Sequence, residues 1–209
     1  IGTETLIIHG VDELHSADIE IIPDRIEAGT FLMAGALLGE IEVKNIIPKH
    51  LDKVVHKLRE TGCILKINQN SIIITPPEKI KSVDMTTAVY PGFPTDLQAQ
   101  WVAIMSLADG SSVVTDTVYH DRFSHIPELS RLGANIKVEN NTAFIRGKNT
   151  LVGAPVMSTD IRASASLIIA ALAAKGETQI SRVYHIDRGY ENIEQKFEGL
   201  GGDIRRISE

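Results

Sequence analysis

The chain has 209 residues, of which 43% are hydrophobic and 23% charged, and a formal net charge of −6. This composition is that of an ordinary globular protein, and the negative charge argues against non-specific nucleic-acid binding, which needs a basic face. Because no apolar run is long enough to span a membrane and no basic region leads into an apolar stretch at the start, we expect a cytoplasmic protein that does not contact a membrane.

The first part of the chain predicts an alternation of strands and helices. After the apolar run "TLIIHG", the pattern predicts a strand at 19–23, a helix from Arg25 that is apolar almost all round, and a strand in "EIEVKNI". The next helix, "LDKVVHKLRE", is amphipathic, with its apolar residues on one face. A glycine ends this helix, and the strands "CILKIN" and "SIIIT" follow.

The same order of elements then occurs twice more. Helices that begin at Asp96, "DLQAQWVAIMSLADG", and at Asp160, "DIRASASLIIAALAAKG", match the helix from Arg25. Strands are expected in "VDMTTAVY", "SSVVTDTV", "NIKVEN" and "TAFIRG" of the second unit and in "APVMS", "ETQISRV" and "GDIRRI" of the third. The unit recurs about every 70 residues and reads βαβαββ, except that the third copy lacks its last strand.

The three repeated helices predict the fold class. A helix that is apolar on every side must be buried on every side, so we expect the three helices at the centre and the sheets outside. This arrangement is an inside-out α/β barrel of three βαβαββ repeats; an ordinary three-layer α/β sandwich would explain the strands but not three such helices. Trp101 and His125, within predicted helices, are expected to be packing residues. The only cysteine, Cys63, aligns with Ala134 and Gly202 and is expected to be buried in the core.

Polar residues gather where the helices begin. A crossover helix begins at the carboxyl end of its strand, so both helices of a unit begin at the same edge of their sheet. With three units around one axis, the helix N-termini meet at one pole, which suits phosphates and carboxylates. Asp96 and Asp160 begin two central helices, Arg25 and Arg162 lie in the corresponding turns, and the related loops "YHDR" and "YHIDR" face the same pole.

Each polar residue also has a structural alternative. An aspartate at a helix start is what N-capping requires, and Asp160 could serve as a cap alone. The loop "YPGFPTD" is stiffened by its prolines, which favours a fixed, functional carboxylate at Asp96. Arg122 and Arg188 could form surface salt bridges with neighbouring aspartates, although ligand binding is favoured for Arg188. His185 could simply orient its neighbours.

Several of these motifs resemble those of one known family. "FPTDLQAQ" (93–100), "TDIRASASL" (159–167) and "YHIDRGYE" (184–191) look like motifs of the enolpyruvyl transferases, more closely of the UDP-N-acetylglucosamine 1-carboxyvinyltransferase branch. "PDRIEAGTF" (23–31) and "HIPELSRLGA" (125–134) agree, so the resemblance covers nearly the whole chain. It implies transfer of the enolpyruvyl group of phosphoenolpyruvate to the 3′-hydroxyl of UDP-N-acetylglucosamine with release of phosphate, the first committed step of peptidoglycan synthesis. It implies neither a cofactor nor a metal.

The resemblance also implies roles for individual residues. Asp96 would contact the sugar 3′-hydroxyl and act as the general base, with Thr95 beside it. Val118 would touch the nucleotide-sugar, and Arg188 would bind phosphoenolpyruvate when the domains close. The remaining residues expected to contact the substrates in the cleft are Arg122, Asp160, Arg162 and His185.

The sequence departs from the family pattern in one respect. The family's N-terminal half carries a Lys-Asn pair near its start and a mobile loop with a reactive Cys or Asp, and this chain has neither such a pair near its start nor such a loop. We therefore expect the C-terminal half, with residues 1–20 as the tail of a missing N-terminal domain. Residues 21–209 would form one domain, with repeats at about 18–75, 76–147 and 148–209. "TLIIHG" would pair within the missing domain, and the chain alone would be inactive.

Two functional hypotheses remain open at this point. The chain is either the cleft-forming half of a carboxyvinyltransferase or a non-catalytic domain of the same fold that binds anions or a nucleotide-sugar. The stiff loop before Asp96 and the two arginine-bearing loops favour the first hypothesis.

Overall fold

The structure, a computed structural model, describes residues 5–207. Its first unit places a buried helix before a three-stranded sheet of order β1-β3-β2, in which both strand pairs are antiparallel. The elements of this unit are α1 (Arg25–Leu38), β1 (Ile41–Lys44), the 3-10 helix η1 (Pro48–Leu51), α2 (Asp52–Glu60), β2 (Ile64–Ile67) and β3 (Ser71–Thr75).

The second unit contains the whole predicted βαβαββ order. Its sheet has the order β4-β5-β7-β6, with β4 parallel to β5 and the other pairs antiparallel. The elements of this unit are β4 (Met85–Thr86), the 3-10 helix η2 (Thr95–Leu97), α3 (Gln98–Met105), β5 (Ser111–Thr115), α4 (Ile126–Arg131), β6 (Asn135–Glu139) and β7 (Thr142–Arg146).

The third unit is the smallest. Its elements are β8 (Pro155–Met157), α5 (Ala163–Ala173), β9 (Gln179–Ser181), α6 (Tyr184–Asp187) and α7 (Ile193–Gly199), with β8 parallel to β9. The "YHIDR" segment, expected to be a loop, contains the short helix α6. The strand expected in "GDIRRI" is wrong, since the structure assigns none to 202–207. In the other units β2 and β6 pair only with the last strand of their sheet, and the third unit has no such partner among its described residues.

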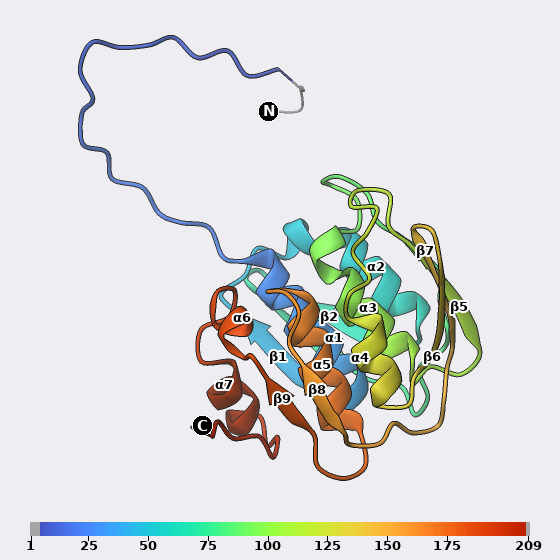
Figure 1. Cartoon of the computed structure of the whole chain (residues 1–209). Coiled ribbons are helices and arrows are strands. Elements are labelled where there is room, and N and C mark those ends of the chain that lie inside the picture. Colours follow the sequence, from blue (N-terminus) through green and yellow to red (C-terminus); the bar gives the residue numbers. More distant parts are fainter. Residues whose placement is uncertain (1–4, 208–209) are drawn as a thin grey trace.

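The strand expected at 19–23 is also wrong. No helix or strand is assigned to residues 5–24, and this segment runs away from the folded body (Figure 1). In the second and third units the first strand pairs in parallel with the next strand over only two (β4–β5) or three (β8–β9) residue pairs. So short a parallel pair supplies few hydrogen bonds to hold a strand such as the one expected at 19–23. Leu6, Ile7 and Ile8 are exposed, and the expected pairing of "TLIIHG" with another domain stays a prediction.

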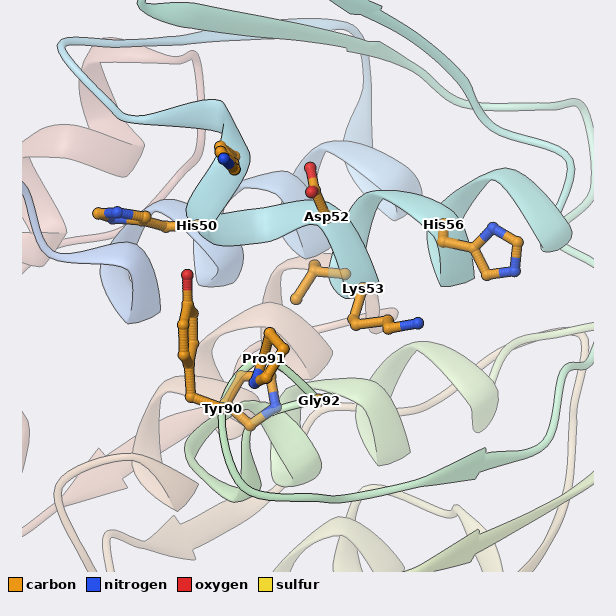
Figure 2. A pocket seen from close by; sticks show the side chains of 10 residues that line it. His50, Asp52, Lys53, His56, Tyr90, Pro91 and Gly92 are labelled. Atoms are coloured by element: carbon orange, nitrogen blue, oxygen red, sulfur yellow. The ribbon is translucent and has the colours of Figure 1, made fainter. Parts of the chain in front are cut away.

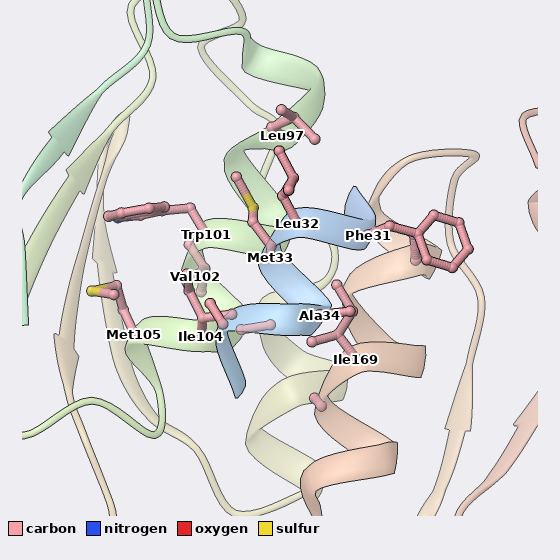
Figure 3. Packing of buried hydrophobic residues seen from close by; sticks show 14 of the residues in the cluster. Phe31, Leu32, Met33, Ala34, Leu97, Trp101, Val102, Ile104, Met105 and Ile169 are labelled. Carbon is pink, nitrogen blue, oxygen red and sulfur yellow. The ribbon is translucent and has the colours of Figure 1, made fainter. Parts of the chain in front are cut away.

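The three apolar helices lie at the centre, as predicted. Helices α1, α3 and α5 pack against one another, with the sheets outside them (Figure 1). Figure 3 shows Leu32 of α1, Ile104 of α3 and Ile169 of α5 in the shared core, all fully buried. Trp101 and Cys63 are buried as expected. None of the helices within the described part of the chain is both long and apolar enough to cross a membrane.

One backbone feature repeats in all three units. Gly62, Gly133 and Gly201 have φ angles of 98°, 94° and 92°, in the left-handed region that glycine adopts at little cost. Each follows the last helix of its unit, and the next residue donates a backbone hydrogen bond five residues back, to Leu58, Leu129 and Phe197 respectively. This is the Schellman ending of a helix, so the glycine repeat in the sequence corresponds to a repeated helix end.

The central core should dominate stability. We expect Leu32→Ala, at a fully buried position of α1, to lower the free energy of unfolding by about 2–5 kcal/mol, because it removes apolar contacts and leaves a cavity. Leu200→Ala, at a side chain that is 52% exposed, is the matched control and should change stability by less than about 1 kcal/mol. Urea unfolding followed by circular dichroism measures both, and similar losses in the two variants would contradict a core centred on α1.

Candidate active site

The loops that carry the predicted site residues meet at one end of the molecule. They follow the carboxyl ends of the parallel pairs β4–β5 and β8–β9. Neighbouring units contact one another at this end. The contacts are His50 with Tyr90 (ring centroids 6.4 Å apart), Ser124 Oγ with Thr159 Oγ1 (3.2 Å) and Arg162 Nη2 with Asp24 Oδ2 (3.3 Å). The starts of all three units therefore lie around a common centre.

Asp96 is held by an arginine from the neighbouring loop. It lies in η2, directly before α3, and its side chain is 40% exposed. Arg122 Nη1 donates to Asp96 Oδ1 at 2.5 Å and to Thr95 Oγ1 at 3.4 Å. The Asp96 side chain makes no capping hydrogen bond among the described residues, so helix capping does not account for it. The sequence allowed a surface salt bridge between Arg122 and a neighbouring aspartate. The structure instead pairs Arg122 with Asp96, and not with Asp121.

Asp160 behaves as the capping alternative predicts. Its Oδ1 accepts hydrogen bonds from the backbone N–H groups of Arg162 and Ala163, both at 2.7 Å, at the start of α5. Such bonds satisfy N–H groups that a helix start leaves without partners. Asp160 thus has a structural role whether or not it also contacts a ligand.

Arg162 lies half-buried between the first and third units. Besides its ion pair with Asp24, Arg162 Nη1 donates to the carbonyl oxygen of Gly189 at 3.2 Å, and the guanidinium lies over the Tyr190 ring at 5.2 Å. These contacts tie Arg162 to the "YHIDRGYE" segment. The arginine therefore fixes the loop that carries Arg188.

Arg188 is exposed, and its guanidinium has no hydrogen-bond or ion-pair partner within residues 5–207. The neighbouring carboxylate, Asp187, is bound by Arg206 at 2.6 and 2.9 Å, and this contact lowers the pKa of Asp187. The surface salt bridge considered from the sequence is thus absent, which leaves the guanidinium available. His185, by contrast, has its Nε2 3.2 Å from Arg182 Nη2, as the orienting alternative expects.

Two site-forming residues were not predicted. One of them is Asp116, a buried carboxylate directly after β5, which organises the loop that carries Val118. Val118 itself was predicted and is 40% exposed. Tyr190 is also buried, and its hydroxyl lies 2.8 Å from Thr30 Oγ1 and 3.2 Å from Gln100 Nε2. Burial raises the pKa of Tyr190. The available sequence signals were a polar residue at the carboxyl end of a strand and a tyrosine inside the family-like motif "YHIDRGYE".

A shallow pocket lies beside this site rather than in it. Figure 2 shows Lys53 and His50 of the first unit facing Tyr90, Pro91 and Gly92 of the loop that leads to Asp96. None of the predicted substrate-contacting residues lines it. The predicted site residues therefore lie on the loops outside this pocket. Within the described residues no three His, Cys, Asp or Glu side chains form a group that could hold a metal ion.

His125 is buried without a hydrogen-bond partner for either ring nitrogen among the described residues. Burial lowers the pKa of His125 to about 4, an effect that Asp160 opposes and Arg122 reinforces. The imidazole is therefore neutral near pH 7 and packs as an apolar ring, 6.3 Å from the Phe123 ring. This agrees with the packing role expected for it.

The His125 environment predicts a pH dependence of stability. Its pKa is about 4 in the folded chain and about 6.5 when unfolded, so the unfolded state binds more protons between these values. We expect the free energy of unfolding to fall by up to about 3 kcal/mol as the pH drops from about 6.5 to about 4. Urea unfolding at several pH values should show this loss in the wild type and a smaller loss in His125→Phe. Identical pH profiles would contradict the assignment.

Comparisons with known proteins agree with this architecture. Curated relatives named UDP-N-acetylglucosamine 1-carboxyvinyltransferase include those of Myxococcus xanthus, 50% identical over 98% of this chain and 49% of the relative, and Koribacter versatilis, 53% identical over 100% of this chain and 48% of the relative. The chain spans about half the length of the curated relatives it matches.

Solved structures match as well. The enolpyruvyl transferase NikO from Streptomyces tendae superposes with a TM-score of 0.79 at 29% identity, over 90% of this chain and 45% of that one. EPSP synthase from Acinetobacter baumannii, at 16% identity and a TM-score of 0.68 over 90% of this chain and 45% of that one, supports the fold alone. The profile of one family, described as EPSP synthase (3-phosphoshikimate 1-carboxyvinyltransferase), matches residues 1–197. With its three repeated units around buried helices, the chain belongs to the EPSP synthase family.

Proposed function

We propose that this chain forms one half of a carboxyvinyltransferase that moves the enolpyruvyl group of phosphoenolpyruvate to the 3′-hydroxyl of UDP-N-acetylglucosamine and releases phosphate. The names of relatives at about half identity support this choice of substrates. The reaction would serve peptidoglycan synthesis, and hence cell shape and division, in the cytoplasm.

One observation in the site carries the proposal. A partly exposed carboxylate, Asp96, and an exposed arginine whose guanidinium has no protein partner among the described residues, Arg188, lie on loops at the same end of the molecule. A hydroxyl nucleophile needs a base, and a phosphate leaving group needs positive charge. The site offers both, and the helix N-termini at this end add partial positive charge.

The roles follow from the atoms that change. Asp96 would accept the proton of the sugar 3′-hydroxyl while the hydroxyl oxygen forms a bond to C2 of phosphoenolpyruvate. C3 takes up a proton from solvent in this addition and gives one up again when the double bond re-forms. The bond from C2 to the phosphate oxygen breaks, and phosphate leaves with its electron pair. Arg188 would hold the phosphoenolpyruvate anion, and Arg122 and Arg162 would add positive charge around the site. Thr95 and Val118 would contact the nucleotide-sugar, and His185 would lie beside Arg188.

The site is open to solvent in the described residues, so we propose that a second domain closes over it. The share of the relatives that the chain covers supports this proposal. The proposed division keeps residues 21–209 as one domain and assigns 1–20 to the second. We use "assembled enzyme" for this chain together with that second half.

The experiment that tests the function is a product analysis with the assembled enzyme. Phosphate release that depends on both phosphoenolpyruvate and UDP-N-acetylglucosamine is expected. Tight calorimetric binding of the nucleotide-sugar with no phosphate release, by enzyme shown to be folded, would instead support the non-catalytic alternative. Replacing UDP-N-acetylglucosamine by shikimate 3-phosphate is the control for substrate class.

A further inference from the structure

At the end of the molecule that carries the candidate site, the carboxylate of Asp116 is fully buried and accepts several hydrogen bonds. Its Oδ1 accepts hydrogen bonds from Thr87 Oγ1 at 2.7 Å and from the backbone N–H groups of Val118 at 3.0 Å and Tyr119 at 2.9 Å. Its Oδ2 accepts from Thr95 Oγ1 at 2.6 Å. Four donors therefore converge on the two oxygens of one buried carboxylate.

These donors come from three separate segments of the site. Thr87 follows β4, Thr95 begins the turn that carries Asp96, and Val118 and Tyr119 begin the loop that carries Arg122. One carboxylate thus joins both loops to the sheet. Buried hydrogen bonds to a charged group are stronger than those between neutral groups, so the junction should be rigid.

The backbone of Asp116 is itself held in place. Its N–H donates to the Asn141 carbonyl oxygen at 2.9 Å, and Asn141 Nδ2 donates to the Asp116 carbonyl oxygen at 3.0 Å. Asn141 lies in the turn between β6 and β7. The carboxylate is therefore anchored to the sheet and holds the loops against it.

The direction of the hydrogen bonds links Asp116 to the predicted base. A carboxylate only accepts hydrogen bonds, so Thr95 must donate its single hydroxyl proton to Asp116. The Thr95 oxygen can then only accept, and Arg122 Nη1 donates to it at 3.4 Å. The same Arg122 nitrogen donates to Asp96 at 2.5 Å. A chain of hydrogen bonds therefore links the two carboxylates: Arg122 donates to Asp96 and to Thr95, and Thr95 donates to Asp116.

We propose that Asp116 is a positioning residue: it sets the orientation of the Thr95 hydroxyl and the place of the Val118–Arg122 loop, and so aligns Arg122 with the catalytic carboxylate. The inference deepens the proposed function and rests on it for its kinetic readout. Asp116 does not contact the reacting atoms. It acts through Thr95, Val118 and Arg122.

The amide substitution Asp116→Asn tests this directly. It keeps the size of the side chain but replaces one accepting oxygen by a donating NH₂ group, so at least one of the four donors loses its acceptor. In the assembled enzyme we expect kcat to fall about 10- to 100-fold and KM for the nucleotide-sugar to rise about 10-fold, with a smaller change in KM for phosphoenolpyruvate, because Arg188 lies on another loop.

A matched control comes from the other end of the same strand pair. Asp84, directly before β4, also accepts a backbone hydrogen bond, from Val113 N at 2.7 Å, but it is exposed and lies at the opposite end of β4 from Thr87. Asp84→Asn should leave both KM values and kcat within about twofold of the wild type. Equal kinetic losses in both variants would mean that general destabilisation, not positioning, explains the effect.

Two further measurements separate positioning from stability. A double variant, Asp116→Asn with Thr95→Val, should show a kinetic loss well below the product of the single losses, because both changes interrupt one hydrogen-bond chain. Hydrogen exchange should become faster in peptides covering 117–123 of Asp116→Asn, and not in those covering the central helices. Independent kinetic losses, or unchanged exchange in 117–123, would overturn the proposal.

The exchange experiment needs no activity, so the two proposals fail separately. An inactive but folded wild type would refute the proposed function, while exchange would still decide whether Asp116 holds the loop. An active wild type with Asp116→Asn kinetics like those of Asp84→Asn would leave the function standing and overturn the positioning role.

Discussion

Asp96→Asn in the assembled enzyme is expected to lower kcat by about 10²–10⁴-fold, the usual contribution of a general base. In the wild type Arg122 donates a hydrogen bond to Asp96 Oδ1, and an amide of the same shape can still accept this bond. The amide cannot take the proton of a hydroxyl. The affinity for the nucleotide-sugar should change far less than kcat. Steady-state phosphate release and calorimetry on the same protein separate the two effects.

Asp109→Asn is the matched control for this prediction. Asp109 is exposed and follows α3, at the opposite end of the helix from Asp96. It should keep wild-type turnover. Turnover of Asp96→Asn close to that of the control would show that the general base is a different group.

Arg188→Ala is expected to raise KM for phosphoenolpyruvate about 10- to 100-fold, while the affinity for the nucleotide-sugar stays close to that of the wild type. The guanidinium has no competing partner within residues 5–207, so its loss removes a charge-assisted contact to the anion, worth about 1.5–3 kcal/mol. Calorimetric titration of each substrate and steady-state kinetics measure the split.

Arg146→Ala provides the control, since Arg146 ends β7 opposite Ser111, at the other edge of the sheet from the site loops. It should behave as the wild type. A loss of nucleotide-sugar affinity in Arg188→Ala, with KM for phosphoenolpyruvate unchanged, would assign the loop to the other substrate.

Much of the fold could be predicted because local patterns repeat. Three helices apolar on every side predicted a helical centre, and α1, α3 and α5 do pack together there. The apolar residues at 19–23 and 202–207 predicted strands that the structure does not contain. A strand forms only where a neighbour supplies hydrogen bonds, and for 202–207 the described residues contain no last strand of the third sheet to do so.

The site was predictable only in part, since side-chain partners depend on distant segments. From the sequence, one alternative was an ion pair between Arg188 and its neighbour Asp187. In the structure Asp187 forms its ion pair with Arg206 instead. Sequence reasoning offered capping for Asp160, which the structure bears out, and it left out Asp116. Nothing in "TDTV" reveals that four donors from three segments meet at its aspartate.

The most direct test of the account is the mass of the nucleotide-sugar after incubation with phosphoenolpyruvate, measured together with released phosphate. The assembled enzyme should convert UDP-N-acetylglucosamine to its enolpyruvyl ether, with one phosphate released for each ether formed. The 209-residue chain alone should give neither product, because half of the site would be missing. An unchanged sugar mass with the folded assembled enzyme, or full conversion by this chain alone, would contradict the account.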